Sequence, residues 1–327
     1  MNRYKVVATT VTFGKINKEP LERLQTNGCD VITNPFGRPF TNEEFVEYAA
    51  DADALIVGND KVTLDVITHC RQLKVIAKHG VGCDGIDVKA ANKRGIVVTY
   101  APGSNAEEVS DLAFGLMLMS ARGLYQANRD TKAGKWIKPI GMSLYQKTIG
   151  IIGLGHIGCC TAKRAKGFSM KVLGYDIFKN PNAVALGVKF VPLDDLLQQA
   201  DFISLHLPLT AQTRNLLNRQ RIQNLKSNCV IVNTARSQLV DYDALTEALQ
   251  TGSLKGYATD VYESEPPEHL PLFDCPKVIV TPHIGGTTIE SNLRMGDTAV
   301  DNVLAVLRGE TVSYTHLRAH ETLRHLV

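Results

Sequence analysis

The segment GIIGLGHIGCC, residues 150–160, carries three glycines in a spacing that can bind a dinucleotide. Gly153, Gly155 and Gly158 form the pattern G-x-G-x-x-G, and the β-branched run TIGIIG leads directly into it. In such a turn the first glycine permits the tight bend and the second lets the backbone approach a pyrophosphate. The third lets the following helix pack closely on the strand. A lone match is weak evidence, so the flanking residues decide whether this turn binds a nucleotide.

The residues after the turn supply that context. The helical segment HIGCCTAKRAKGF follows, and its first turn would offer the free N–H groups of His156 and Ile157 to phosphates. The next strand-like run, KVLGYD, ends at Asp176, about 20 residues after the first glycine, as the fingerprint requires. Its carboxylate can accept hydrogen bonds from ribose hydroxyls and would repel a 2′-phosphate. The pattern therefore predicts NAD, rather than NADP, as the cofactor.

Groups able to move a proton and orient a substrate follow three later strand-like runs. A nicotinamide enzyme needs both functions, and in parallel sheets they lie at the carboxyl ends of strands. Arg236 ends the run CVIVNTAR, Asp260 and Glu265 lie in YATDVYESEP, and His283 lies in VIVTPHIGG. Any one of them alone is most often a surface charge or a satisfied polar group. Three at successive strand ends, beside a dinucleotide turn, predict an active site.

The elements that position these residues form two series of short β-branched runs alternating with helical stretches. One series extends from KVVATT to GIVVTY and the other from TIGIIG to VIVTPHI. The predicted fold class is α/β, with two doubly wound parallel-sheet domains and a cleft between them. We expect a flavodoxin-like substrate domain formed by residues 1–103 and 288–312, and a Rossmann NAD-binding domain formed by residues 104–287. The helical stretch AEEVSDLAFGLMLMSARGL is apolar nearly all round in its second half and should therefore be buried, with a second subunit as a candidate partner.

The composition fits a soluble globular protein and gives no sign of other partners. The 327 residues are 44% hydrophobic and carry a net charge of +3, which favours neither a nucleic-acid nor a membrane partner. The start, MNRYKVVATT, lacks the apolar block of a signal peptide. Seven scattered cysteines without a CxxC pair predict reduced thiols, a cytoplasmic location and no metal site.

The last segment, SYTHLRAHETLRHLV from Ser313, fits no element of this fold. Its histidines, His316, His320 and His325, could be taken for a metal-binding tract. We expect instead a disordered terminus or a non-native tail of the kind produced by read-through into foreign sequence.

Four motifs in order carry a family resemblance: KHGVGCDGID with AANKRGIVV, NTAR with VDYDAL, ATDVYESEPP, and TPHIGG. Together they resemble the D-isomer-specific 2-hydroxyacid dehydrogenases, most closely the phosphoglycerate-dehydrogenase-like members. The resemblance implies reversible hydride transfer between NADH and a 2-keto acid. Arg236 would bind the substrate carboxylate and keto oxygen, and His283 would donate a proton to that oxygen. Glu265 would hydrogen-bond His283 and raise its pKa.

The same resemblance implies further contacts. Asp260 would hold the nicotinamide carboxamide, and the backbone N–H groups of Val81 and Gly82 would bind the substrate carboxylate. It also implies a homodimer built through the long apolar helix near residues 106–120. Other cofactor contacts would come from the loops after two central strands: Pro208, Thr213, Thr234 and Ala235.

Departures from the family pattern leave the substrate open. Ser237 replaces the glycine that usually follows the arginine, where a positive φ would be strained. Gly58 and Asn59 stand in a loop where phosphoglycerate dehydrogenases commonly carry an arginine, although Lys78 or Lys61 could supply a cation. The candidate substrates are 3-phosphoglycerate with 3-phosphohydroxypyruvate, or hydroxypyruvate and glyoxylate. An NAD(H)-sensing binding protein of the corepressor type, which shares these motifs, is the alternative.

Overall fold

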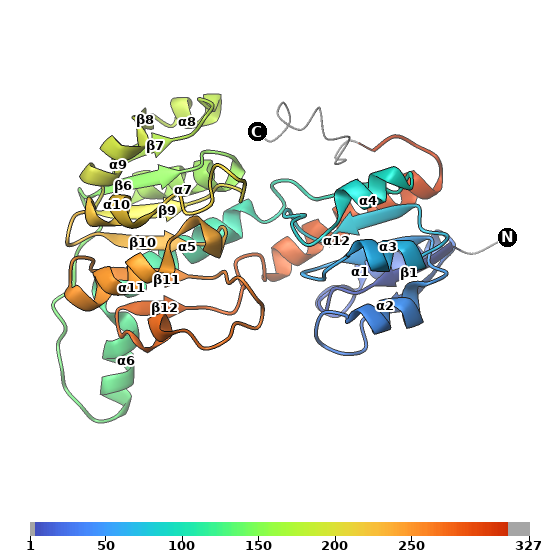
Figure 1. Ribbon diagram of the computed structural model, residues 1–327, viewed down its shortest axis with the longest axis horizontal. Helices are drawn as coiled ribbons and strands as arrows, with labels where there is room; N and C mark the ends of the chain where they lie inside the picture. The colour runs from blue at the N-terminus through green and yellow to red at the C-terminus, as the bar shows by residue number, and fades with distance from the viewer. Residues whose placement is uncertain (1–3, 313–327) are drawn as a thin grey trace. The chain divides into compact units, whose positions relative to one another are not determined.

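The computed structural model describes residues 4–312, so the predicted tail from Ser313 lies outside the described residues. The chain divides into two compact units, each shown in Figure 1. One unit comprises the described residues up to Asn105 together with those from Gly286 onward, and the other comprises Ala106–Gly285. Within residues 4–312, no helix has the length and apolar character needed to span a membrane.

The first unit is built on a five-stranded parallel sheet with the order β2-β1-β3-β4-β5. This is the doubly wound order found in flavodoxin-like folds, so the predicted class of this unit is confirmed. Gly58 directly follows β3, Lys78 ends β4, and the 81–82 segment lies in the loop after β4. The strands are β1 (Tyr4–Ala8), β2 (Cys29–Thr33), β3 (Ala54–Val57), β4 (Val75–Lys78) and β5 (Val97–Thr99).

Helices cover both faces of this sheet, because alternate strand residues point to opposite sides. Val6 and Ala8 pack with Val300 and Val303 on one face, whereas Val7 packs with helices on the other face. The segment after Gly286 therefore completes the core begun by the first hundred residues, and Figure 1 shows α12 beside α1. The helices are α1 (Glu19–Thr26), α2 (Asn42–Ala49), α3 (Leu64–His69), α4 (Val88–Lys93) and α12 (Ile289–Leu307).

The second unit is built on a seven-stranded parallel sheet with the order β12-β11-β10-β9-β6-β7-β8. It contains the Rossmann order, in which the strand order reverses between the first and fourth strands, here β6 and β9. The predicted fold class is thus confirmed for this unit as well. The strands are β6 (Thr148–Ile152), β7 (Lys171–Tyr175), β8 (Lys189–Phe190), β9 (Phe202–Leu205), β10 (Val230–Asn233), β11 (Gly256–Thr259) and β12 (Val278–Val280).

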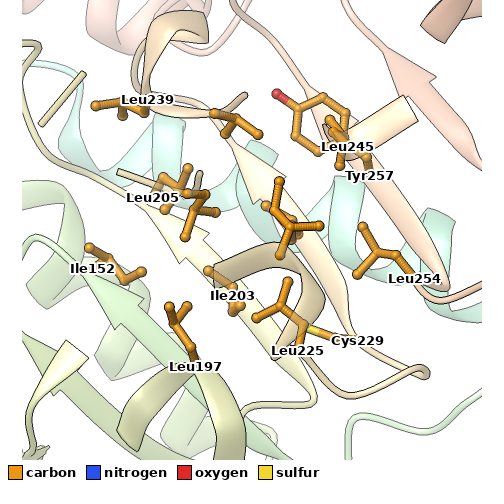
Figure 2. Close-up of a cluster of buried hydrophobic side chains, with 14 of the residues drawn as sticks. Ile152, Leu197, Ile203, Leu205, Leu225, Cys229, Leu239, Leu245, Leu254 and Tyr257 are labelled. Atoms are coloured by element: carbon orange, nitrogen blue, oxygen red, sulfur yellow. The ribbon is translucent and has the colours of Figure 1, made fainter. Parts of the chain in front are cut away.

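Two apolar clusters fill the faces of the larger sheet. Figure 2 shows the first, in which Ile203 and Leu205 of β9 lie among leucines of the covering helices and Tyr257 of β11. The second cluster lies under α5 and α7, where Phe114 and Met117 are buried. The predicted burial of the long apolar helix is therefore confirmed for most of its apolar side chains, and α7 and the sheet of the same unit supply the contacts. The helices are α5 (Ala106–Arg122), α6 (Leu124–Lys132), α7 (His156–Gly167), α8 (Pro181–Ala185), α9 (Leu193–Gln199), α10 (Arg219–Gln223) and α11 (Tyr242–Thr251), with 3₁₀ turns η1 (Ser237–Leu239) and η2 (Pro271–Asp274).

Candidate active site

The turn between β6 and α7 has the geometry that its glycines predict. Gly153 adopts φ +93°, and a Cβ added there would lie 2.4 Å from the carbonyl oxygen of His206. A Cβ added at Gly158 would lie 2.0 Å from the carbonyl oxygen of Gly153. Both contacts are far inside van der Waals distance, so a larger residue at either position would force the turn open.

The middle glycine faces open space instead. A Cβ added at Gly155 would meet no atom within 4 Å, and this residue caps α7 without a side chain. The helix begins at His156, so the backbone N–H groups of His156 and Ile157 lie in its first turn. First-turn N–H groups lack partners within the helix and favour an anion. This cradle fits the pyrophosphate of a dinucleotide.

Asp176 follows β7, the strand beside β6, and is held against the glycine turn. Its Oδ2 accepts a hydrogen bond from the Leu154 N–H at 2.6 Å, and its Oδ1 accepts one from the Phe178 N–H at 3.3 Å. A carboxylate has lone pairs for about four hydrogen bonds, so both oxygens can still accept from ribose hydroxyls. The donor set therefore fits the adenosine side of NAD.

The other predicted residues follow three neighbouring strands. Arg236 follows β10, Glu265 lies in the loop after β11, and His283 lies just beyond β12. These strands pair in parallel, β10 with β11 and β11 with β12. Because carboxyl ends of parallel strands share one edge of a sheet, the fold brings all three loops to the same edge.

His283 and Glu265 form a direct pair. The Nδ1 atom of His283 lies 2.5 Å from Oε1 of Glu265, and about a third of each side chain is exposed, 37% and 29% respectively. A carboxylate at Nδ1 selects the tautomer with a proton on that atom and orients the ring. Proton exchange with a substrate is then left to Nε2, as a general acid–base histidine requires.

Asp260 fixes the loop that carries His283. This carboxylate is only 2% exposed and accepts three hydrogen bonds: from the Thr281 hydroxyl at 2.7 Å, the Ile284 N–H at 2.8 Å and the Gly285 N–H at 2.7 Å. Between these anchors His283 adopts φ +53°, which is costly for a residue with a side chain. The sequence analysis did not predict that Asp260 would hold this loop. The predicted contact of Asp260 with the nicotinamide carboxamide stays a prediction.

A second buried side chain fixes the loop that carries Arg236. The Nδ2 of Asn233, the last residue of β10, donates to the Arg236 carbonyl at 2.9 Å, and its Oδ1 accepts from the Ala235 N–H at 3.1 Å. Asn233 is fully buried, whereas Arg236 is half-buried. Ser237 opens the turn η1, and its φ is not positive. The serine at this position therefore avoids the strain considered above.

The remaining cofactor candidates lie in loops after β9 and β10. The Thr213 hydroxyl donates to the Pro208 carbonyl at 2.8 Å and accepts from the Thr210 N–H at 2.7 Å, which closes the loop after β9. Ala235 is buried, and the Thr234 hydroxyl is shielded from solvent. Their predicted contacts with the cofactor stay predictions.

The substrate candidates of the first unit lie at the end of β4. Lys78 is buried to 9% exposure, and its ammonium donates a hydrogen bond to the Gly58 carbonyl. Val81 and Gly82 are half-buried in the loop that follows, and Lys61 is exposed. Their roles, and the assignment of substrate binding to this unit with boundaries at 103 and 287, stay predictions.

Comparison with known proteins agrees with this geometry. Residues 114–285, within the second unit, match the model of the D-isomer specific 2-hydroxyacid dehydrogenase, NAD binding domain. The chain is 45% identical over 276 residues to a D-3-phosphoglycerate dehydrogenase of Methanocaldococcus jannaschii; the match covers 83% of this chain but 52% of that one. It is 39% identical over 321 residues to a glyoxylate reductase of Thermofilum pendens, covering 95% of this chain and 93% of the reductase.

Solved structures show the same likeness. The TT0316 protein of Thermus thermophilus matches with a TM-score of 0.88 at 36% identity, over 96% of this chain and all of that one. The D-lactate dehydrogenase of Aquifex aeolicus, solved with NAD and lactic acid, matches with a TM-score of 0.80 at 28% identity, over 94% and 96% of the two chains. The chain therefore belongs to the D-isomer specific 2-hydroxyacid dehydrogenases, and the family, NAD cofactor and oxidoreductase class predicted from its motifs are confirmed.

Proposed function

We propose that this enzyme reduces a short 2-keto acid to the D-2-hydroxy acid, with Arg236, Glu265 and His283 as its catalytic residues. The observation that carries the proposal is the pair at 2.5 Å between His283 Nδ1 and Glu265 Oε1, at the sheet edge that also holds Arg236. When bound, NADH supplies the hydride. The chain's own residues then have to bind the carboxylate and deliver one proton.

Each of these residues has a chemical task that its position supports. The guanidinium of Arg236 binds the substrate carboxylate through two N–H groups, as its planar fork allows. The Nε2 of His283 donates the proton to the keto oxygen, while Glu265 keeps the imidazolium oriented and balances its charge. Asp260 and Asn233 hold the two loops in place through the hydrogen bonds described above.

Among substrates, we favour an unphosphorylated keto acid such as glyoxylate or hydroxypyruvate. The buried Lys78 already donates to the Gly58 carbonyl, and the loop after β3 carries no arginine. A relative that is similar over nearly its whole length is a glyoxylate reductase. 3-Phosphohydroxypyruvate is the second candidate, supported by the 45% identity to a D-3-phosphoglycerate dehydrogenase, of which this chain spans about half the length.

We also propose a homodimer and a cytoplasmic location. Much of the apolar surface of α5 is buried in its own unit, but Leu112, Leu118 and Met119 are only half-buried, so α5 can still contribute to a dimer contact. Trp136 and Ile140, in the extended segment after α6, are 81% and 97% exposed, and Ile137 is 59% exposed. Adjoining exposed apolar side chains mark a protein-binding surface. Within residues 4–312 no disulfide joins any of the seven cysteines, which suits a reducing compartment.

The experiment that tests the function follows the loss of NADH absorbance with glyoxylate, hydroxypyruvate, 3-phosphohydroxypyruvate and pyruvate in turn. Turnover that His283→Ala abolishes, with NADH binding retained, would support the dehydrogenase, and the order of kcat/KM values would rank the substrates. Tight NADH binding without turnover of any keto acid would instead favour the nucleotide-sensing alternative.

A further inference from the structure

A histidine outside the proposed chemistry lies beneath the glycine turn. His206 directly follows β9, the strand next to β6 at the point where the strand order reverses. Its backbone N–H donates to the Ile152 carbonyl at 2.8 Å, which extends the pairing of the two strands. Its carbonyl carbon and oxygen are the atoms that a Cβ on Gly153 would strike, at 2.5 and 2.4 Å. The backbone of His206 thus packs directly against Gly153 in the glycine turn.

The side chain of His206 reaches the helix that follows the turn. Its Nε2 lies 3.0 Å from the Thr161 hydroxyl in α7 and 2.8 Å from the Ser204 hydroxyl in β9. Thr161 in turn donates to the carbonyl of Ile157 at 3.0 Å, in the first turn of α7. Two hydrogen bonds therefore connect the end of β9 to Ile157, whose N–H group would help to hold a pyrophosphate.

This polar cluster lies in an otherwise apolar layer. Ser110 of α5, whose hydroxyl is 3.3 Å from that of Thr161, is fully buried, as are Thr161 and Ser204. Apolar side chains, among them Met117, Ile151 and Ala162, fill the rest of the space between α5, α7 and the sheet. Burying hydroxyl groups costs free energy that apolar side chains would avoid. A role in fixing α7 explains why polar groups occupy this position.

The protonation of the ring follows from the same contacts. Burial lowers the pKa of His206 to about 3, so the ring is neutral near neutral pH. Its Nδ1 is shielded from solvent and has no hydrogen-bond partner among the described residues. A shielded lone pair is tolerated better than a shielded N–H, so the proton belongs on Nε2. The Nε2–H then faces the hydroxyl oxygens of Ser204 and Thr161, which both act as acceptors, and the threonine proton is free for the Ile157 carbonyl.

We propose that His206 is a positioning residue for the dinucleotide: through Thr161 it holds the first turn of α7 in the orientation that binds the pyrophosphate. The substrate plays no part in this contact. His206 should therefore affect the affinity for NADH and leave the chemical step alone.

The test measures the Kd of NADH by fluorescence, together with kcat at saturating NADH, in the full-length protein. We expect His206→Leu and Thr161→Val each to raise the Kd about 5- to 10-fold, with kcat within about twofold of the parent. The double variant should bind NADH no more weakly than either single variant, because both remove the same link. Since binding is measured without substrate, a wrong choice of keto acid cannot mimic a failure of this proposal.

Conservative variants separate positioning from folding. The amide of His206→Gln can reach the Nε2 position and should restore affinity, whereas the shorter amide of His206→Asn should not. Thr161→Ser keeps the hydroxyl and should bind normally, and His269→Leu, at an exposed histidine paired with Asp274, is the matched control. Equal NADH affinity in the Gln, Asn and parent proteins would overturn the proposal, as would a lower Tm without a change in Kd. If the leucine variant does not fold, the Gln and Asn pair decides alone.

Discussion

Asp260→Asn is the substitution that most directly tests how His283 is held. The two side chains have nearly the same shape, so the change replaces one acceptor oxygen with an NH₂ group and removes the charge. In the structure Oδ1 accepts from Thr281 and Ile284, and Oδ2 accepts from Gly285. Whichever oxygen is replaced, the new NH₂ group faces at least one backbone N–H, so two hydrogen-bond donors meet and neither has an acceptor.

The cost follows from these contacts. A hydrogen bond to a charged group contributes about 1.5–3 kcal/mol, and a buried N–H left without an acceptor costs a further 1–3 kcal/mol or so. We therefore expect the anchored loop to lose about 2–4 kcal/mol relative to a relaxed loop. His283 holds a left-handed φ of +53°, a strain of about 1–3 kcal/mol. Release of the loop would let that residue relax and move its imidazole away from Glu265.

The assay compares kcat and the Kd of NADH in Asp260→Asn with the parent protein. We expect kcat to fall about 100-fold, equivalent to about 2.7 kcal/mol, while the Kd of NADH changes less than about threefold. Thr281→Val, which removes one of the three donors and leaves both N–H contacts, should lose much less. A kcat near the parent value with a Kd raised more than about tenfold would refute this reasoning. It would show that Asp260 serves the carboxamide rather than the loop.

Three further outcomes can be measured on the same protein. Gly158→Ala should abolish NADH binding and lower the Tm, because the new Cβ would lie 2.0 Å from a carbonyl oxygen. Gly155→Ala should keep the Tm, because the new Cβ would meet no atom within 4 Å, but it should raise the Kd of NADH about tenfold. Burial, and then the charge of its lysine neighbour, lower the pKa of His79 to about 4. Between that value and about 6.5 only the unfolded chain binds this proton, so His79 should contribute about 2 kcal/mol to the fall in the free energy of unfolding from pH 7 to pH 5. Denaturant titration of His79→Gln should show a smaller fall, and an unchanged slope would contradict the assignment. Trp136→Ala with Ile140→Lys should convert a dimer to monomers in sedimentation velocity at unchanged Tm, and a dimer that persists would place the interface elsewhere.

Much of the candidate site could be predicted because its residues depend on local sequence. The glycine turn is recognisable from Gly153 to Asp176, since the whole fingerprint lies within one β-α-β unit. Arg236, Glu265 and His283 each follow a β-branched run. Away from the point where the strand order reverses, successive runs of a doubly wound fold become neighbouring parallel strands, as β10, β11 and β12 do. The order of these runs along the chain was therefore enough to predict that the three residues lie at the same edge of the sheet.

Features that depend on pairing across the fold could not be predicted in the same way. The apolar pattern of residues 106–122 indicated burial, but it could not show that α7 and the sheet of the same unit cover much of this helix. Asp260 lies far along the chain from the 281–285 loop that it anchors, and no local pattern connects them. Ser237 suggested strain by analogy with glycine, whereas the 3₁₀ turn places it at an ordinary φ.

A common arrangement links four polar residues of the larger sheet. The carboxyl ends of four strands of the larger sheet carry a polar residue whose side chain holds a functional loop or helix: Asp176 after β7, His206 after β9, Asn233 in β10 and Asp260 after β11. In a parallel sheet the carboxyl ends of the strands lie at one edge, but the loop after each strand is not fixed by the pairing of the strands. Hydrogen bonds from the last strand positions restrict the motion of that loop where the strand itself is rigid. Substitutions that remove these hydrogen bonds at the four positions should therefore impair ligand binding or turnover more than they lower the Tm. Substitutions in the apolar layers beneath them should do the reverse.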